Sequence, residues 1–162
     1  MSISTCIWFD ACAEEAARFY VAAFRACGRE AAITALRRYP IDGPKPRNSV
    51  MTVEMTLDGM RVLALNGGPH FTPTPALSLM VLCRNQREID QFWEALAAGG
   101  AKGRCGWLTD RFGVSWQVVP ENMSALLADP VRAEAVMRAL SGMGKVDIAV
   151  LRQAYDGAGG AR

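Results

Sequence analysis

The chain has 162 residues, of which 51% are apolar and 21% charged, a composition that fits one globular domain and excludes a disordered chain. The 18 Lys and Arg residues exceed the 16 Asp and Glu residues by only two, and no run of basic residues could bind along the phosphate backbone of a nucleic acid. No segment approaches the roughly 20 apolar residues of a membrane-spanning helix, and the first residues do not resemble a signal peptide. We therefore expect a cytoplasmic protein that binds neither nucleic acid nor membrane.

The first part of the chain predicts a βαβββ module over residues 1–72. An amphipathic helix follows the first strand and ends at Gly28. The turn Asp58-Gly59 lies between two alternating apolar runs and predicts a β-hairpin. The predicted strands span residues 4–9, 31–39, 49–57 and 60–66.

The second part predicts a similar module over residues 76–120, because an internal repeat appears at an offset of 73 residues. The repeat aligns the apolar stripes of the two helices, and the second helix ends at Gly99-Gly100. The aligned pairs are Ala16 with Ile89, Phe19 with Phe92, Tyr20 with Trp93, Ala23 with Leu96 and Phe24 with Ala97. The predicted strands span residues 77–83, 102–108 and 114–119.

A helical tail is predicted over residues 121–162. Asp129 followed by Pro130 predicts a helix start, and Leu140 belongs to the apolar stripe of that helix. A shorter helix follows around Leu151, and the chain is expected to fray from Gly157 onward.

Several segments closely resemble the PhnB-like family of the glyoxalase/bleomycin-resistance/dihydroxybiphenyl dioxygenase superfamily, also called the vicinal oxygen chelate proteins. The resemblance extends over nearly the whole chain, including the tail. The segments that carry it are Trp8-Phe9-Asp10, Ala13-Glu14-Glu15-Ala16-Ala17, Phe19-Tyr20, and residues 49–54, 65–71, 105–108 and 112–120.

The resemblance implies an α+β fold in which two βαβββ modules place curved mixed sheets around a cavity, within one glyoxalase-like domain over residues 1–162. It also implies a bacterial protein that forms a homodimer. Members of the family are often labelled 3-demethylubiquinone-9 3-methyltransferase. A methyltransferase of the common type needs a glycine-rich strand-to-helix turn for its adenosyl cofactor, and no G-x-G-x-x-G motif follows a strand here.

Superfamily enzymes bind a divalent metal through His, Glu or Gln side chains on the first and last strands of each module. By the resemblance, these positions are Thr5, Val62 or Ala64, Ser78 and Gln117. Only Gln117 is a suitable ligand, whereas such a site needs about three protein ligands of N, O or S type. We therefore expect no metal and no other cofactor.

The same alignment predicts the pocket that remains for a ligand. If Thr5 and Ser78 face the cavity, alternate strand residues face it too, and Trp8 packs under the first helix. The residues that are then expected to face inward are Ile7, Phe9, Val62, Ala64, Asn66, Met80, Leu82, Ser115, Gln117 and Val119. The predicted ligand pocket consists of Thr5, Ile7, Asn66, His70, Ser78, Trp107 and Gln117.

Two residues are candidates for catalysis. His70 is the only histidine and lies in a predicted loop, where it could act as an acid or base or could order the turn. Glu54 could be a carboxylate held on a sheet face, or it could be solvated or paired with Arg61. Cys105 follows Arg104, which could lower the pKa of its thiol, but no base nearby could activate it.

These observations favour a metal-independent protein that holds a small organic molecule in the cavity between its modules. The alternative is an enzyme of the same fold, a lyase, isomerase, dioxygenase or antibiotic-resistance enzyme. Such an enzyme would use His70, Glu54 or a metal held partly by Gln117. A third hypothesis is the methyltransferase of the family label.

Overall fold

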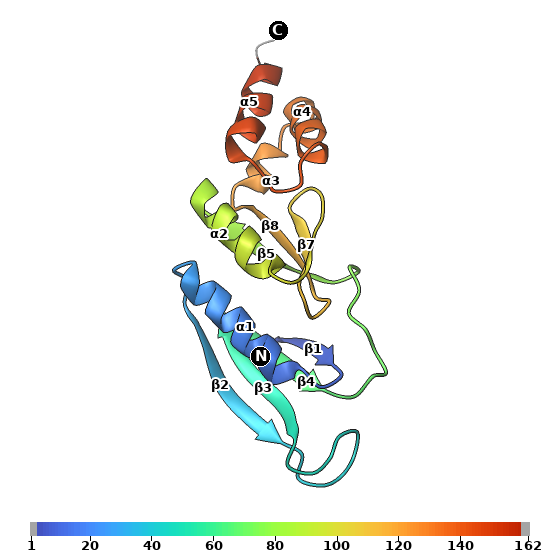
Figure 1. The fold of residues 1–162 in the computed structure, drawn as a ribbon. Coiled ribbons are helices and arrows are strands. Elements are labelled where there is room, and N and C mark those ends of the chain that lie inside the picture. The colour runs from blue at the N-terminus through green and yellow to red at the C-terminus, as the bar shows by residue number, and fades with distance from the viewer. Residues whose placement is uncertain (1–2, 160–162) are drawn as a thin grey trace. The chain divides into compact units, whose positions relative to one another are not determined.

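The computed structural model describes residues 3–159, and the chain divides into two compact units, Met1–Pro75 and Ala76–Arg162. We call them the N-terminal unit and the C-terminal unit. Each contains a four-stranded mixed sheet with a long helix lying across one face (Figure 1). The predicted α+β fold of two βαβββ modules is therefore confirmed.

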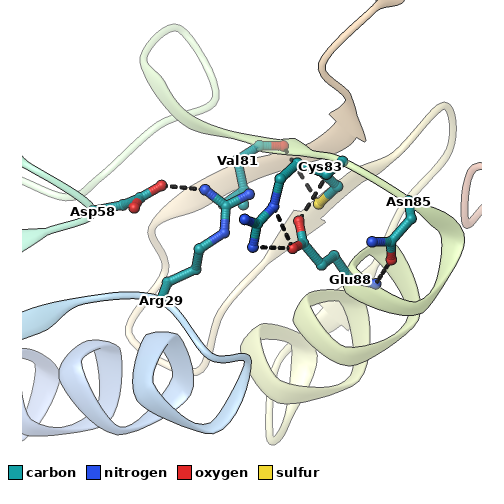
Figure 2. Close-up of polar contacts among 7 residues, drawn as sticks. Arg29, Asp58, Val81, Cys83, Asn85 and Glu88 are labelled. Carbon is teal, nitrogen blue, oxygen red and sulfur yellow. Dashed lines mark hydrogen bonds and ion pairs between the residues drawn. The ribbon is translucent and has the colours of Figure 1, made fainter.

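The N-terminal unit has the strand order β1-β4-β3-β2, in which β1 runs parallel to β4 and the other pairs are antiparallel. The predicted hairpin between β3 and β4 forms at Asp58 (φ 49°) and Gly59 (φ 83°), the two positive φ angles that a tight hairpin turn requires. The elements are β1 (Thr5–Phe9), α1 (Ala13–Ala26), β2 (Ala31–Arg38), β3 (Val50–Leu57) and β4 (Met60–Asn66). Arg29, just before β2, forms an ion pair with Asp58 of the hairpin turn (Figure 2).

Asn66 joins the start of α1 to the sheet. Its Oδ1 accepts a hydrogen bond from the Ala13 backbone N–H at 2.8 Å, and its Nδ2 donates to the Val50 carbonyl at 3.0 Å. Cys12, the residue at the N-cap of α1, makes no side-chain capping bond. Asn66 therefore supplies from another element a partner for one of the exposed amides at the helix start.

This contact fixes which face of the sheet α1 covers. Because Asn66 points toward α1, the alternate residues Val62 and Ala64 of β4 do so as well. Thr5 and Ile7 of β1 stand opposite Val62 and Ala64, so they share the helix-covered face. The other face, which we call the open face, carries residues such as Cys6, Trp8, Glu54, Arg61 and Leu63.

The predicted inward direction of Thr5, Ile7, Phe9, Val62, Ala64 and Asn66 is therefore wrong, as is the placement of Trp8 under the helix. The reason is a difference of one residue in loop length. Three residues, 10–12, connect β1 to α1, whereas two residues, 84–85, connect the equivalent strand and helix of the second module. The helices align at the predicted offset, but Thr5 then corresponds to Leu79 rather than to Ser78.

Trp8 packs instead against the loop that follows β4. Its Nε1 donates to the Gly68 carbonyl at 2.8 Å, and its ring meets Phe71 edge-on with 5.1 Å between the centroids. A Cβ at Gly67 would lie 2.1 Å from the Trp8 ring, so only glycine fits there.

The C-terminal unit has the strand order β5-β8-β7-β6, with β5 parallel to β8. The single strand predicted over residues 102–108 is wrong, because Cys105 (φ 57°) and Gly106 (φ 81°) form a turn that divides it into two short antiparallel strands. The elements are β5 (Ser78–Cys83), α2 (Gln86–Ala97), β6 (Ala101–Lys102), β7 (Trp107–Thr109) and β8 (Ser115–Pro120).

Side chains at the start of α2 cap the helix by accepting hydrogen bonds from backbone N–H groups (Figure 2). The Asn85 side chain accepts a hydrogen bond from the Glu88 backbone N–H at 3.0 Å. The buried Glu88 carboxylate accepts from the Arg84 backbone N–H at 2.9 Å and from Arg84 Nε at 2.7 Å. This arrangement resembles a capping box and fixes where the helix begins.

The tail forms three helices within the C-terminal unit: α3 (Met123–Leu126), α4 (Pro130–Ser141) and α5 (Ile148–Gly159). The predicted start of α4 is confirmed, because the Asp129 side chain accepts from the Val131 backbone N–H at 2.9 Å. The chain was expected to fray from Gly157 onward, but this prediction is wrong for residues 157–159, because α5 continues to Gly159. Residues 160–162 lie outside the described residues. Helices α4 and α5 pack together, with Arg132 over the Tyr155 ring at 4.6 Å (Figure 1).

Candidate functional site

A cavity of about 440 Å³ lies on the open face of the N-terminal unit. Its size is typical of small-molecule sites. Residues of β2, β3 and β4 form most of its wall, together with Ser4 just before β1. The lining residues are Ser4, Thr34, Glu54, Met55, Thr56, Arg61, Val62 and Leu63.

Two opposite charges lie in this cavity. Glu54 forms an ion pair at 3.5 Å with Arg37, so the partner of Glu54 is on β2 and is not the expected Arg61. The Arg61 side chain makes no hydrogen bond or ion pair with any residue in the described range 3–159. The cavity therefore combines a paired carboxylate with a guanidinium whose N–H donors are available.

In the C-terminal unit, we call the sheet face opposite the buried side chains of Leu79, Val81 and Cys83 the open face, and it brings together three of the predicted pocket residues. Gln117 Nε2 donates a hydrogen bond to Ser78 Oγ at 2.9 Å, and Trp107 stands directly opposite Gln117 in the β7–β8 register. Met80, one residue beyond Leu79 on β5, is 54% exposed. Ser78 and Gln117 therefore lie on the same face of this sheet.

The other predicted pocket residues lie elsewhere. Thr5, Ile7 and Asn66 are on the helix-covered face of the N-terminal unit, where Asn66 has the capping role described above. His70 is exposed in the loop after β4, does not line the cavity, and makes no side-chain hydrogen bond or ion pair within the described part of the chain.

Cys105 lies in the turn before β7. Its backbone N–H donates to the Met143 carbonyl at 2.8 Å. Arg104, the expected basic neighbour, instead directs its guanidinium to the Ser141 carbonyl at 2.8 Å. Arg104 and Cys105 therefore connect this turn to the end of α4.

Sequence reasoning did not place Arg61, Thr34, Thr56 or Ser4 in a site. The signal that could have found Thr56 and Arg61 is the hairpin register, which sets them opposite each other and so puts both on the face that carries Glu54. Cys6 lies on the same open face, and partial burial raises the pKa of its thiol.

The residues do not fit the metal site of the vicinal oxygen chelate enzymes that the sequence resembles. Thr5 and its partner Val62 face α1, and Ser78 and Gln117 are hydrogen-bonded to each other. No group of three or more His, Cys, Asp or Glu side chains among residues 3–159 is arranged to hold a metal ion. A hydroxyl and one amide are a poor donor set for a divalent transition metal.

The residues also do not fit the glycine-rich type of adenosyl-methionine site. The two strand-to-helix connections, residues 10–12 and 84–85, contain no glycine. Their backbones therefore lack the close approach that such a cofactor requires.

Comparisons with known proteins agree with the fold. The sequence model of the family described as 3-demethylubiquinone-9 3-methyltransferase matches residues 1–119. The PhnB protein from Bacillus cereus is 33% identical, with a TM-score of 0.64 over 74% of this chain and 99% of that one. Protein PA1353 from Pseudomonas aeruginosa shares the fold at 21% identity, with a TM-score of 0.59 over 74% of this chain and 98% of that one. No curated protein matches the chain.

The comparisons also correct one expectation. The family match ends at residue 119, so it does not include the helical tail.

Among residues 3–159, no helix combines the length and the apolar character needed to cross a membrane. With a family match over most of its length and a relative at 33% identity, the chain belongs to the PhnB-like family, whose sequence model carries the description 3-demethylubiquinone-9 3-methyltransferase.

Proposed function

We propose that this protein binds a small polar organic molecule without the help of a metal ion. The observation that carries the proposal is the cavity of about 440 Å³ on the open face of the N-terminal unit, which contains Arg61 and Glu54. A pocket of this size with a few convergent polar groups is the usual form of a small-molecule site.

The lining residues indicate how such a molecule is held. The Arg61 guanidinium donates charge-assisted hydrogen bonds to an acidic group of the ligand, the strongest kind available in this cavity. Glu54, oriented by Arg37, accepts from a hydroxyl or amino group, and Leu63 contacts the apolar part.

The open face of the C-terminal unit is a separate candidate surface for a small molecule in this proposal. The hydrogen bond to Ser78 fixes the Gln117 amide and leaves its Oε1 as an acceptor and its second N–H as a donor. Trp107 beside it offers a flat ring for a planar group.

Catalysis is the weaker alternative on this geometry. An enzyme of the same fold would need an acid or base in the cavity, and Glu54 is the only carboxylate among the lining residues. That carboxylate is bound to Arg37, and His70 is in a loop outside the cavity lining. We therefore place binding ahead of catalysis.

A homodimer is part of the same proposal. Leu77 and Met80 of the C-terminal unit are 63% and 54% exposed, a degree of apolar exposure that a second copy of the chain would cover. The mass of the native protein in dilute solution tests this: the mass of two chains is expected, and the mass of one chain would contradict it.

The ligand proposal is tested by a thermal-shift screen of small carboxylates and amino acids against the wild type, Arg61→Ala and Arg18→Ala. Arg18 lies on the outer surface of α1, paired with Glu14, and is a matched control. Compounds that raise the melting temperature of the wild type and of Arg18→Ala, but not of Arg61→Ala, are expected. A screen without such compounds, or one whose hits act equally on Arg61→Ala, would contradict the proposal.

A further inference from the structure

The helical tail creates a groove that the family-matched part of the chain does not have. The groove has a volume of about 800 Å³ and lies within the C-terminal unit, between the β5–α2 turn and α5. The turn, residues 84–86, belongs to the family match, whereas α5 lies beyond residue 119, where the match ends. The Bacillus protein aligns over 99% of its length with 74% of this chain.

The α5 wall is held firmly in place. Gln86 donates to the Val146 carbonyl at 3.0 Å and accepts from the Ile148 backbone N–H at 2.9 Å, which ties the start of α5 to the start of α2. Lys145 forms an ion pair with Asp90 of α2 at 2.7 Å, and Leu151 is fully buried beneath the helix. The groove is therefore preformed and does not depend on a ligand to bring its walls together.

Residues from three successive turns of α5 line the groove. Ile148 and Ala149 make its first turn apolar, Arg152 supplies a positive charge in the next turn, and Asp156 supplies a negative charge one turn later. The two residues are four positions apart, so they are separated by about 6 Å along the helix axis at a rise of about 1.5 Å per residue. The groove thus changes from apolar to cationic to anionic along its length.

Both charges are available to a ligand. Within residues 3–159, neither the Arg152 nor the Asp156 side chain makes a hydrogen bond or ion pair, although they are four residues apart on one helix. A basic residue placed before an acidic one at this spacing is the less favourable order for a helical ion pair. A bound molecule with complementary charges would therefore not have to break an existing bridge.

The opposite wall adds little net charge. Arg84 lines the groove, but its Nε and one terminal nitrogen are bound to the Glu88 carboxylate behind it. A simple anion in the groove would meet Asp156, and a simple cation would meet Arg152. A molecule that carries both charges satisfies both side chains, so charge complementarity favours a zwitterion.

We propose that this groove binds a short zwitterionic peptide of about two residues. Its carboxylate contacts Arg152, its ammonium group contacts Asp156, and the apolar side chain of its last residue packs against Ile148 and Ala149. An extended dipeptide spans about 7 Å, enough to reach from one charge to the other. This site is separate from the cavity of the N-terminal unit.

Titration of the full-length protein with L-alanyl-L-leucine, followed by calorimetry or NMR, tests the proposal. N-acetyl-alanyl-leucine removes the ammonium charge, and alanyl-leucine amide removes the carboxylate charge. Each capped peptide is expected to bind roughly tenfold more weakly than the free dipeptide, because it loses one charged contact. No binding of the free dipeptide, or equal binding of all three compounds, would overturn the proposal.

Two charge variants assign the contacts to their residues. Arg152→Gln is expected to bind the free dipeptide and its amide equally, and Asp156→Asn to bind the free and the acetylated dipeptide equally. Arg87→Gln, on the exposed side of α2 and outside the groove lining, is the matched control and is expected to keep both preferences. Retention of either preference in the corresponding variant would contradict the assignment.

A steric variant separates the groove from a general charge effect. A side chain at Gly157 would project into open space, because nothing lies within 4 Å of its Cβ position. Gly157→Leu is therefore expected to fold with an unchanged or higher melting temperature and to abolish dipeptide binding by filling the groove. Undiminished binding to Gly157→Leu would place the dipeptide elsewhere and overturn the proposal.

Discussion

At the scale of single residues, Asn66 shows how a polar side chain in a predicted pocket can have a structural role. It is 4% exposed, and its amide satisfies the Ala13 N–H at the start of α1 and the Val50 carbonyl at the start of β3. The Asn66 backbone carbonyl also accepts a hydrogen bond from the Tyr39 hydroxyl at 2.5 Å. The residue therefore connects three segments of the N-terminal unit.

Replacement of Asn66 by Ala is expected to lower the free energy of unfolding by about 2 kcal/mol, because two buried backbone groups lose their partner. Denaturant unfolding measures the change. Asn122→Ala is the matched control, since Asn122 is the residue at the N-cap of α3 but makes no side-chain capping bond there. Equal stability of the two variants would show that the Asn66 contacts contribute nothing.

Gln117→Ala is expected to leave the fold intact and to weaken the binding of a small molecule to the open face of the C-terminal unit. The side chain is half-buried, and within residues 3–159 it forms a hydrogen bond only with Ser78, so its loss leaves little structure unsupported. Melting temperature and ligand titration report the two effects separately. An unchanged affinity would remove Gln117 from the site.

Single residues also show where prediction from the sequence reached its limit. Ser78, Trp107 and Gln117 share the open face of the C-terminal unit as expected, whereas Thr5 and Ile7 lie on the helix-covered face of their sheet. Side chains alternate along a strand, so one extra residue in the β1–α1 connection was enough to invert the first module. The apolar stripes of the helices carry no information about that connection.

At the scale of secondary-structure elements, α4 offers a clear test of whether the tail is structural. Leu140 is 7% exposed on this helix, whereas Val131, on the same helix, is 66% exposed. Leu140→Asp is expected to lower the melting temperature or to alter the native mass, because it buries a carboxylate without a partner. Val131→Asp, the matched control, is expected to change neither. A Leu140→Asp protein with an unchanged melting temperature and native mass would refute the structural role.

The ion pair between α2 and the segment before α5 gives a pH dependence. The hydrogen bond from Lys145, and then that from Gln86, lowers the pKa of Asp90 below its ordinary value, and the same bond to Asp90 raises the pKa of Lys145. The stabilisation from Asp90 is therefore present above about pH 4 and is lost as the pH falls through the lowered pKa. That from Lys145 is present below about pH 10 and is lost as the pH rises further.

Unfolding of the wild type and of Asp90→Asn across the acid range checks this. The two proteins are expected to differ in stability at neutral pH, and the difference is expected to shrink as the pH falls below about 4 and through the lowered pKa of Asp90. A difference that stays constant down to pH 2 would show that the ion pair is not its cause.

The elements themselves were predicted well where local chemistry determines them. The Asp58-Gly59 hairpin and the Asp129-Pro130 helix start follow from turn and capping preferences. The division of residues 102–108 into β6 and β7 was not predicted, because it depends on a left-handed Cys105 that the sequence alone does not reveal. In that conformation, the backbone N–H groups of Cys105 and Gly106 donate hydrogen bonds to the carbonyls of residues 143 and 144.

At the scale of the whole molecule, the internal repeat indicated two modules, and separate motifs such as residues 49–54, 65–71 and 112–120 carried the resemblance to the family. The groove along α5 could not be predicted, because its walls are brought together by Gln86, which bonds to Val146 and Ile148 far along the sequence. The chemistry of the cavity was also hidden, since Arg61 and Thr34 come from strands that meet only through β3. Function at this scale depends on such contacts and does not follow from the fold.

The most direct test of the account is the metal content of the protein. Elemental analysis would be made on protein purified without a histidine tag from cells grown with added zinc, manganese, iron and nickel. Because Ser78 and Gln117 bind each other and Thr5 faces α1, we predict far less than one metal ion per chain. About one ion per chain would contradict the proposal of metal-independent binding and would favour an enzyme of the same fold.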